Sequence, residues 1–170
     1  MIMSAFKTRD PAFLVKVFVA YVRPVLEYAS TVWSTSSVAC CTILENVQRR
    51  FTRRLRGMAD MDYEQRLSTL KLSSLEDRRI LNDMLLVYKV FHHRTNVSAG
   101  DIGIALRHAP TRSNGNRLQH FKPASVLISN TFKCRAPIEW ESIPVTAVSR
   151  QSIKHFKKDL KQHFCSQHLS

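Results

Sequence analysis

The sequence predicts an all-α protein, a bundle of four to five helices followed by a linker, a short possible strand and two C-terminal helices. Three observations support this fold class. Apolar residues recur at helical spacing over most of the chain. Only four glycines and six prolines occur in 170 residues. The apolar content of 44% is sufficient for a hydrophobic core in a chain of this length.

The first helix is predicted to begin at Asp10, an N-cap residue followed by proline at the first helical position. Pro24 lies further along and should kink or split the helix, because proline cannot donate a backbone hydrogen bond. A second helix is predicted from about Val38 to Gly57, where glycine favours a helix stop. Apolar residues at helical spacing define one face of the first helix: Phe13, Leu14, Val17, Phe18, Tyr21, Val25 and Tyr28.

Two further helices complete a predicted helical domain of residues 1–95. Asp62 is expected to cap a short helix. Ser73 and Glu76 have the spacing of a capping box, with Ser73 as the cap. The helix that they open is expected to run to about Arg94. Apolar residues cover more than half of its circumference, so we expect it to lie at the centre of the domain.

The composition changes after this domain. Residues 96–116 are rich in serine, glycine and asparagine and are predicted to form a loop or linker. Residues 117–170 are predicted to form a basic C-terminal helical extension with a short strand at Leu118–Lys122. Pro137 interrupts the first of its two helices. The second begins near Ser152, and its apolar face consists of Ile153, Phe156, Leu160 and Phe164.

The chain has a formal net charge of +13 and a pI near 10.1. Such a charge indicates an anionic partner, nucleic acid before an anionic membrane, although structural proteins can also be basic. The most apolar stretch, Phe13–Trp33, contains Lys16, Arg23, Pro24 and Glu27. These residues exclude an ordinary transmembrane helix. A membrane-surface partner is not predicted either, because both basic helices are expected to belong to a folded core and not to lie on lipid.

The four cysteines form neither a Cys-x-x-Cys pair nor a regular disulfide framework: Cys40, Cys41, Cys134 and Cys165. The sequence also shows no secretory signature. We therefore expect reduced thiols and an intracellular protein, nuclear or cytoplasmic.

No pattern typical of an active site occurs in the sequence. A two-metal nucleotidyltransferase needs paired carboxylates, and Asp60-Met61-Asp62 is better explained as a turn and a helix cap. The sequence contains no P-loop, H-E-x-x-H or G-x-S-x-G motif. His163, Cys165 and His168 could offer three zinc ligands, but a structural zinc site usually has four. We predict no catalytic residue, no metal ligand and no cofactor for this chain.

Residues 44–57 hold five arginines against one acid, Glu45. On a helix, Arg49, Arg53 and Arg56 lie opposite the apolar stripe, while Arg50 and Arg54 flank it, and Arg54 is the expected structural arginine. The apolar stripe consists of Leu44, Val47, Phe51, Leu55 and Met58. The predicted nucleic-acid-binding residues are cations of this helix and of the last one: Arg49, Arg50, Arg53, Arg56, Lys154, Lys157, Lys158 and Lys161.

Two interpretations of this basic face stay open. It could be a solvated surface neutralised by acids on neighbouring helices, or a phosphate-binding surface. The local excess of arginine favours the second interpretation. No aromatic residues are interleaved with the outward arginines in the sequence, which favours backbone contact to a duplex over base stacking.

Four segments of the chain, in order, form a recognisable pattern. The first is R-P-V-L-E-Y-A-S-T-V-W (Arg23–Trp33), and the second is L-E-N-V-Q-R-R-F-T-R-R-L-R-G (Leu44–Gly57). The third is D-Y-E-Q-R-L-S-T-L-K-L-S-S-L-E-D-R-R (Asp62–Arg79), followed by V-Y-K-V. The fourth is a spaced set in the tail: Trp140, Ile143, Pro144, Val148, Ser152, Phe156, Lys157 and Leu160. Together these segments resemble the C-terminal region of reverse transcriptases of non-LTR retrotransposons of jockey-like and related types, with residues 1–95 as a thumb-like domain.

The resemblance implies a parent family of RNA-directed DNA polymerases, and for this chain the thumb and the C-terminal extension. A thumb holds the primer–template duplex, an RNA–DNA hybrid or DNA, against the palm and fingers. The catalytic aspartates and a divalent metal such as Mg²⁺ would belong to the palm, which this chain does not include. The expected function is therefore a non-catalytic grip on duplex phosphates. The alternative is a non-enzymatic nucleic-acid or protein-interaction module, such as an expressed retroelement remnant.

Overall fold

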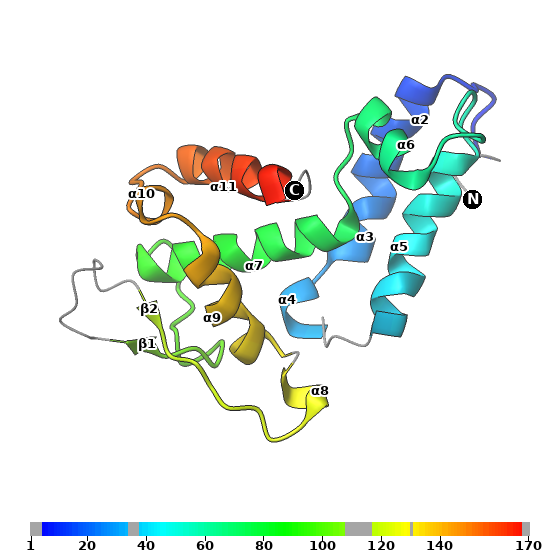
Figure 1. Cartoon of the computed structure of the whole chain (residues 1–170). Coiled ribbons are helices and arrows are strands. Elements are labelled where there is room, and N and C mark those ends of the chain that lie inside the picture. The colour runs from blue at the N-terminus through cyan, green and yellow to red at the C-terminus, as the bar shows by residue number, and fades with distance from the viewer. Residues whose placement is uncertain (1–4, 34–37, 108–116, 130, 168–170) are drawn as a thin grey trace. The chain divides into compact units, whose positions relative to one another are not determined.

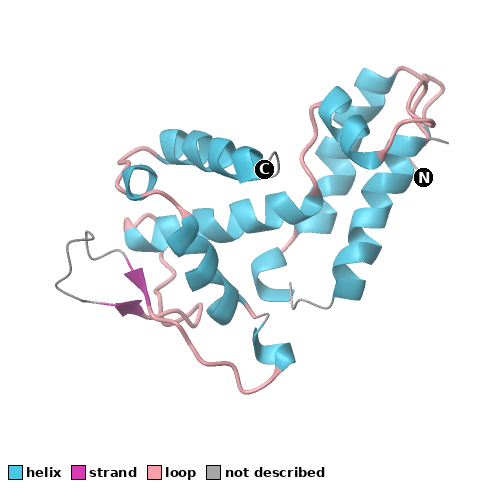
Figure 2. Cartoon of the chain, in the orientation of Figure 1, coloured by secondary structure: helices cyan, strands magenta, loops and turns pink. Residues whose placement is uncertain are grey.

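The computed structural model describes residues 5–33, 38–107, 117–129 and 131–167 (Figure 1). The predicted all-α class is confirmed, because helices predominate and the two strands of the described part have two residues each (Figure 2). Internal contacts divide the chain into two compact units. Unit 1 comprises residues 1–30 and 38–78, and unit 2 comprises residues 31–37 and 79–170.

The helices of unit 1 follow the predicted order. They are α2 (Pro11–Val17), the π-helix η1 (Phe18–Val22), α3 (Arg23–Glu27), α5 (Val38–Arg53), α6 (Tyr63–Leu70) and the first turn of α7 (Leu75–Phe91); the short α4 (Ser30–Trp33) lies at the division between the units. The Asp10 carboxylate accepts hydrogen bonds from the backbone amides of Ala12 and Phe13 at 3.3 and 3.1 Å. The predicted cap at Asp62 is also confirmed, since it forms a capping box with Gln65.

The chain accommodates Pro24 through the π-helix that precedes it. A π-helical turn inserts one extra residue, so the residues that follow are rotated relative to the face of α2. Val22 and Leu26 consequently pack against the core of unit 1, whereas Tyr21 and Val25 are 73% and 74% exposed. The predicted apolar face is thus correct for the buried residues of α2 and wrong for three residues after Phe18: Tyr21, Val25 and Tyr28.

The apolar core of unit 1 is small. Phe18 stacks on Phe51 with ring centroids 4.2 Å apart, and the buried cluster consists of Leu14, Phe18, Phe51, Leu55 and Met58. Helix α5 ends at Arg53, earlier than predicted, and the chain continues in tight turns. Gly57 lies in this turn with φ of 77°, a conformation that favours glycine. Of the predicted apolar stripe, Val47 is exposed.

Unit 2 is built around α7. Its further elements are β1 (Leu106–Arg107), β2 (Arg117–Leu118), α8 (Val126–Ser129), α9 (Phe132–Ser142), α10 (Val145–Val148) and α11 (Ile153–Gln167). Strand β1 pairs antiparallel with β2, with Leu106 opposite Leu118, so the predicted strand is shorter than expected. Tyr88 of α7 stacks on Phe156 of α11 at 4.2 Å. Helix α9 continues through the buried Pro137.

The compact units differ from the predicted division into residues 1–95, 96–116 and 117–170. The chain divides within α7, because the apolar residues of this helix after Arg79 belong to the core of unit 2. Ile104, from the predicted linker, is also buried in that core. Residues 108–116 of the predicted linker lie outside the described part of the chain.

Candidate nucleic-acid interface

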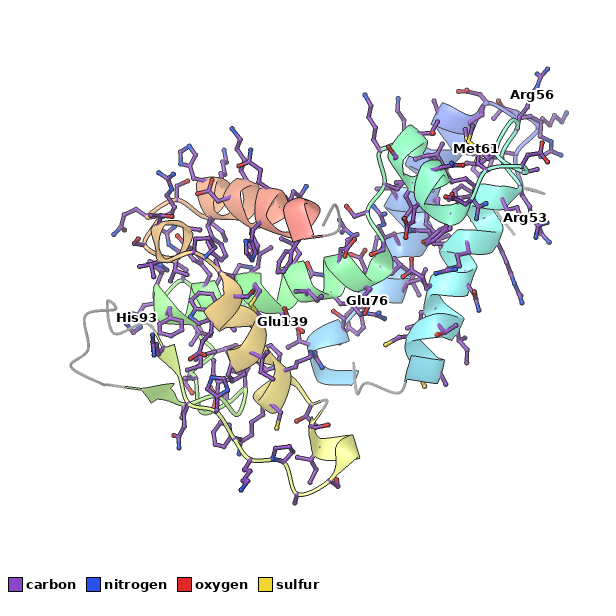
Figure 3. All side chains as sticks on the ribbon, viewed as in Figure 1. Arg53, Arg56, Met61, Glu76, His93 and Glu139 are labelled. Atoms are coloured by element: carbon purple, nitrogen blue, oxygen red, sulfur yellow. The ribbon has the colours of Figure 1, made fainter. Side chains whose placement is uncertain are left out.

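Four predicted phosphate-binding residues form what we call the arginine surface: Arg49, Arg50, Arg53 and Arg56. Three of them lie on the C-terminal half of α5, and Arg56 lies in the turn that follows. All four are exposed. Figure 3 shows Arg53 and Arg56 extending outward from this end of unit 1. The structure therefore brings the four side chains together at one end of a helix and the adjoining turn.

Arg49 is held by an aromatic residue from the next helix. Its guanidinium carbon lies 4.4 Å from the centroid of the Tyr63 ring, at the start of α6. Such a cation–π contact contributes about 0.5–1 kcal/mol at an exposed site. Arg49 itself stays exposed, so this contact orients the guanidinium without removing it from solvent. No local pattern in the sequence indicates this pairing, because the two residues come from different helices.

Arg54 was predicted to border the apolar stripe on a helix, but it lies in the turn after α5. The helix ends at Arg53, so Arg54 begins the turn and its side chain is exposed. The prediction assumed a helix continuing to Gly57. The end of α5 also places Arg56 on a turn instead of on the helix face opposite the stripe.

Carboxylates do not neutralise the arginine surface within the described residues. In that part of the chain, none of its four guanidinium groups forms an ion pair with an acid. The one acid of the stretch, Glu45, is buried and accepts hydrogen bonds from the Leu75 amide at 3.0 and 3.2 Å. It also accepts a hydrogen bond from the hydroxyl of Tyr63. Glu45 therefore caps the N-terminus of α7.

Gln48 is the centre of the same buried polar network and is fully buried. Its amide nitrogen donates to the hydroxyl of Tyr63 and to the carbonyl of Ser73, both at 3.0 Å. Its amide oxygen accepts a hydrogen bond from Nη2 of Arg23 at 3.2 Å. Burial, and then the hydrogen bond to Glu45, raise the pKa of the Tyr63 hydroxyl above its ordinary value, so Tyr63 donates to Glu45 at neutral pH.

Arg23 ties α3 to this network. Its guanidinium also donates to the carbonyl of Ser73 at 3.2 Å. Burial, followed by the nearby charge of Arg78, lowers the pKa of Arg23, while Glu27 opposes that shift. Glu27 in turn accepts two hydrogen bonds from Arg78, one of them at 2.7 Å. The arginine and glutamate of the R-P-V-L-E-Y segment are therefore structural in this unit.

The Ser73 carbonyl accepts hydrogen bonds from Arg23 and Gln48. The side chain that caps α7 is that of Ser74 and not, as predicted, that of Ser73. The hydroxyl of Ser74 accepts a hydrogen bond from the Asp77 amide at 3.0 Å, at the start of α7. Sequence reasoning missed the network because Glu45, Gln48 and Thr52, which are all buried, look like ordinary outward polar residues of an amphipathic helix.

The four predicted cations of the last helix form the lysine surface: Lys154, Lys157, Lys158 and Lys161. All four are exposed on α11, and the opposite face of the helix is buried, as predicted, at Phe156, Leu160 and Phe164. Asp159, also on this helix, pairs with Arg150 at 3.0 Å. The lysine surface belongs to unit 2 and the arginine surface to unit 1, so each is considered by itself.

Metal ligands do not gather in the described part of the chain. No group of three or more His, Cys, Asp or Glu residues there could hold an ion. Of the residues weighed for zinc, the Cys165 side chain and His168 lie outside the described residues. His92 is half-buried, with its ring Nε2 3.2 Å from the Val148 carbonyl. Three cysteines are free thiols in the structure: Cys40, Cys41 and Cys134.

Among the described helices, none is both long enough and apolar enough to cross a membrane. Comparison of the chain with protein-family models, with curated proteins and with solved structures finds no match.

Proposed function

We propose that this chain binds duplex nucleic acid through backbone phosphates, as a non-catalytic, thumb-like part of a non-LTR retrotransposon reverse transcriptase. The observation that carries the proposal is the arginine surface, four exposed guanidinium groups without a paired acid among the described residues. The four segments that resemble this family support its assignment.

Guanidinium groups suit this role because their planar donors match phosphate oxygens, often in pairs. Phosphate contacts do not depend on the base sequence. An enzyme that copies any template needs such sequence-independent binding. The aromatic ring nearest to the arginine surface, Tyr63, is half-buried beneath Arg49, and its hydroxyl is bonded to Glu45. The surface is therefore better suited to a duplex backbone than to stacking on the bases of a single strand.

The lysine surface of α11 is a second expected contact. Ammonium groups act as flexible point charges, so they add long-range attraction more than geometric fit. The proposal assigns no catalytic residue and no metal to either surface. Divalent metal such as Mg²⁺ belongs to the palm of complete family enzymes. An intracellular location, nuclear or cytoplasmic, is part of the same proposal.

The salt dependence of binding tests the proposal. We would measure the affinity of the full chain for an RNA–DNA hybrid by fluorescence anisotropy between about 50 and 300 mM salt. Neutralisation of four phosphates predicts that log K falls with log salt at a slope of about −3 to −4. The triple variant Arg50→Gln, Arg53→Gln, Arg56→Gln should reduce the size of that slope by about 2.5 to 3.

A matched control distinguishes the effect of the arginine surface on the salt slope from the effect of net charge. Lys7, Lys16 and Lys71 are exposed residues of the same unit, and their triple change to glutamine removes the same charge. The control should change the slope by less than about 1. Equal effects of the two triple variants, or binding that does not respond to salt, would contradict the proposal. Far-UV circular dichroism confirms that each variant is folded.

The alternative, a non-enzymatic protein-interaction module, is favoured by a different observation. Several large apolar side chains of unit 1 are exposed, among them Tyr21, Val25 and Ile43.

A further inference from the structure

A further basic stretch, in unit 2, has an aromatic residue among its exposed cations. It comprises residues 117–122, which include β2 and the chain that follows it. The stretch contains Arg117, His120 and Lys122, which are all exposed, and it contains no acid. Phe121 lies between two of these basic residues and is half-buried. The exposed arginines of α5 have no aromatic residue interleaved in this way.

Lys133, the second residue of α9, lies over the Phe121 ring. Its Nζ is 3.8 Å from the ring centroid, within the range of a cation–π contact. Its aliphatic stem passes beside Gly103, where a Cβ would lie 3.7 Å from the Lys133 Cδ. Lys133 is nevertheless exposed. Since the lysine side chain is flexible and lies on the solvent side, the ring face beneath its ammonium group is accessible to a planar ligand.

The basic stretch is positioned by contacts that do not involve the aromatic ring. Leu118 is fully buried and lies in β2, which pairs with β1 (Figure 1). The backbone amide of Gln119 donates a hydrogen bond to the Ala105 carbonyl at 2.8 Å. The ring Nε2 of His120 lies 3.0 Å from a carboxylate oxygen of Glu141, near the C-terminal end of α9. The ring therefore projects from a backbone that is fixed on both sides of it.

The other cations of this region are not neutralised by acids. In the part of the chain that the structure describes, Arg117, Lys122 and Lys133 form no ion pair. Asp101, in the loop before β1, accepts a hydrogen bond from a backbone amide of its own loop at 2.8 Å. Arg117 lies four residues before Phe121, at most about 14 Å along an extended chain. One ring and three cations are thus close enough to contact neighbouring nucleotides of one strand.

We propose that Arg117, Phe121, Lys122 and Lys133, together called the Phe121 surface, bind a short stretch of single-stranded nucleic acid. A base stacks on Phe121 in place of the Lys133 ammonium group, which turns to the phosphate of the same nucleotide. Arg117 and Lys122 contact neighbouring phosphates.

The ring distinguishes a single strand from other anionic ligands. A duplex keeps its bases stacked on one another and offers its backbone, so an aromatic side chain adds little to duplex binding. An acidic peptide would engage the cations without a base to stack on the ring. The Phe121 surface therefore differs in ligand from the arginine surface, and its role does not depend on the function proposed for the latter.

Fluorescence anisotropy with a labelled oligothymidylate of about ten nucleotides tests this surface. The full chain with Arg50→Gln, Arg53→Gln and Arg56→Gln is the starting protein, so that the arginine surface contributes little. We expect Phe121→Leu to weaken single-strand binding about 5- to 100-fold, because the stacking of a base is lost. With the three arginines restored, the same change should alter duplex affinity by less than about twofold. An unchanged single-strand affinity, or an equal loss for the duplex, would overturn the proposal.

Two controls separate stacking from charge. An abasic strand of the same length keeps its phosphates, and Phe121→Leu should leave its affinity unchanged because no base can stack. Tyr21→Leu removes a ring of unit 1 that is 73% exposed, and it should leave single-strand affinity unchanged. If Phe121→Leu weakened an abasic strand or an oligoglutamate peptide as much as oligothymidylate, the ligand would be a general anion or an acidic protein, and the proposal would be overturned.

Lys133→Gln is a second variant that leaves the ring in place, and it serves if circular dichroism shows that Phe121→Leu fails to fold. Loss of one phosphate contact should make the slope of log K against log salt for oligothymidylate less steep by about 0.7. The slope for the abasic strand should change by the same amount, since this contact does not involve the base. An unchanged slope for both strands would overturn the proposed role of Lys133 and, with it, the Phe121 surface.

Discussion

The two compact units are held together by different kinds of interaction. Unit 2 has fifteen buried residues in its apolar cluster, whereas the cluster of unit 1 has five. The described buried polar residues show the reverse distribution: unit 1 contains Arg23, Ser30, Glu45, Gln48, Thr52 and Arg66, and unit 2 contains Arg79 and Asp83. Apolar packing is non-directional, whereas hydrogen bonds fix the rotation and register of the groups that they join.

This difference has a consequence for the proposed function. In unit 1 the polar network fixes α5 relative to α3, α6 and the start of α7, through contacts of Gln48 and Glu45. The arginine surface is on the same helix, so its guanidinium groups project from a positioned backbone. A binding surface gains affinity when its groups are preorganised, because less conformational entropy is lost on binding. Unit 2 presents its lysines on a helix whose inner face is buried through apolar residues such as Phe156 and Leu160.

The largest expected effect comes from breaking the apolar core of unit 2. Phe156→Ala removes a fully buried ring that stacks on Tyr88, and it should lower the free energy of unfolding of unit 2 by about 3–5 kcal/mol. Urea unfolding followed by circular dichroism measures the loss. The neighbouring exposed residue provides the control, since Lys157→Ala should change stability by less than about 0.5 kcal/mol. A loss below about 1 kcal/mol for Phe156→Ala would contradict the packing described for this core.

In unit 1 the substitution to compare with Phe156→Ala is one that removes buried hydrogen bonds. Gln48→Met keeps the shape of a fully buried side chain but removes its bonds to Arg23, Tyr63 and Ser73. Because buried polar groups then lose partners, we expect a loss of about 2–3 kcal/mol. The same change at the exposed Gln119 is the control and should be near neutral. Similar stability of Gln48→Met and the native chain would show that the network does not hold unit 1 together.

The sequence predicted the helices of unit 2 more closely than those of unit 1. Apolar packing, which holds unit 2 together, leaves a periodic pattern in the sequence, whereas the buried hydrogen bonds of unit 1 do not. The last helix could be predicted closely, because Phe156, Leu160 and Phe164 repeat at helical spacing and are all buried. The N-cap at Asp10 could also be predicted, because it depends on the adjacent residues Asp10 and Pro11 alone. Periodicity weighs only hydrophobicity, so it could not identify Gln48 or Glu45 as inner residues of α5. Nor could it locate the π-helical turn, which reverses the exposure expected after Phe18.

The arginine surface, too, could be predicted from local spacing only in part. Exposure of Arg49, Arg50 and Arg53 follows from one helix and was predictable. The end of α5 at Arg53 was not, because Leu55 and Met58 keep the apolar spacing although they lie in a turn and are buried there. The role of Glu45 depends on the distant amide of Leu75 and the hydroxyl of Tyr63. Contacts of this kind between elements leave no mark in local spacing.

The pH dependence of stability offers a third comparison. Asp83 of unit 2 accepts hydrogen bonds from Arg135 at 2.8 and 2.9 Å, yet burial raises the pKa of its carboxyl, an effect that Arg135 partly offsets. A raised pKa means that the folded state holds the proton more tightly than the unfolded state. The contribution of Asp83 to stability therefore falls as pH rises from the ordinary carboxyl pKa of 3.8 through the higher value of the folded state.

Urea unfolding of the native chain and of Asp83→Asn over this range of pH measures that contribution. The native chain should lose stability relative to Asp83→Asn as pH rises, and the difference should become constant above the folded pKa. A difference that grows in favour of the native chain with rising pH would mean that Arg135 outweighs burial and that the pKa is lowered.

The smallest expected effect concerns the link between the network and the arginine surface. If Tyr63 orients Arg49, the two residues should be energetically coupled, by about 0.5–1 kcal/mol for a contact at 4.4 Å. A double-mutant cycle with Arg49→Gln and Tyr63→Leu isolates this coupling, because the hydrogen bonds that Tyr63→Leu loses are common to both sides of the cycle. Arg53→Gln is the matched control, since Arg53 is exposed on the same helix and has no described contact with the ring. Coupling confined to Arg49 would connect the buried network to the proposed phosphate contact. Equal coupling of Arg53 with Tyr63 would instead indicate a general loosening of α5. In that case Tyr63 would have no specific role in orienting the arginine surface.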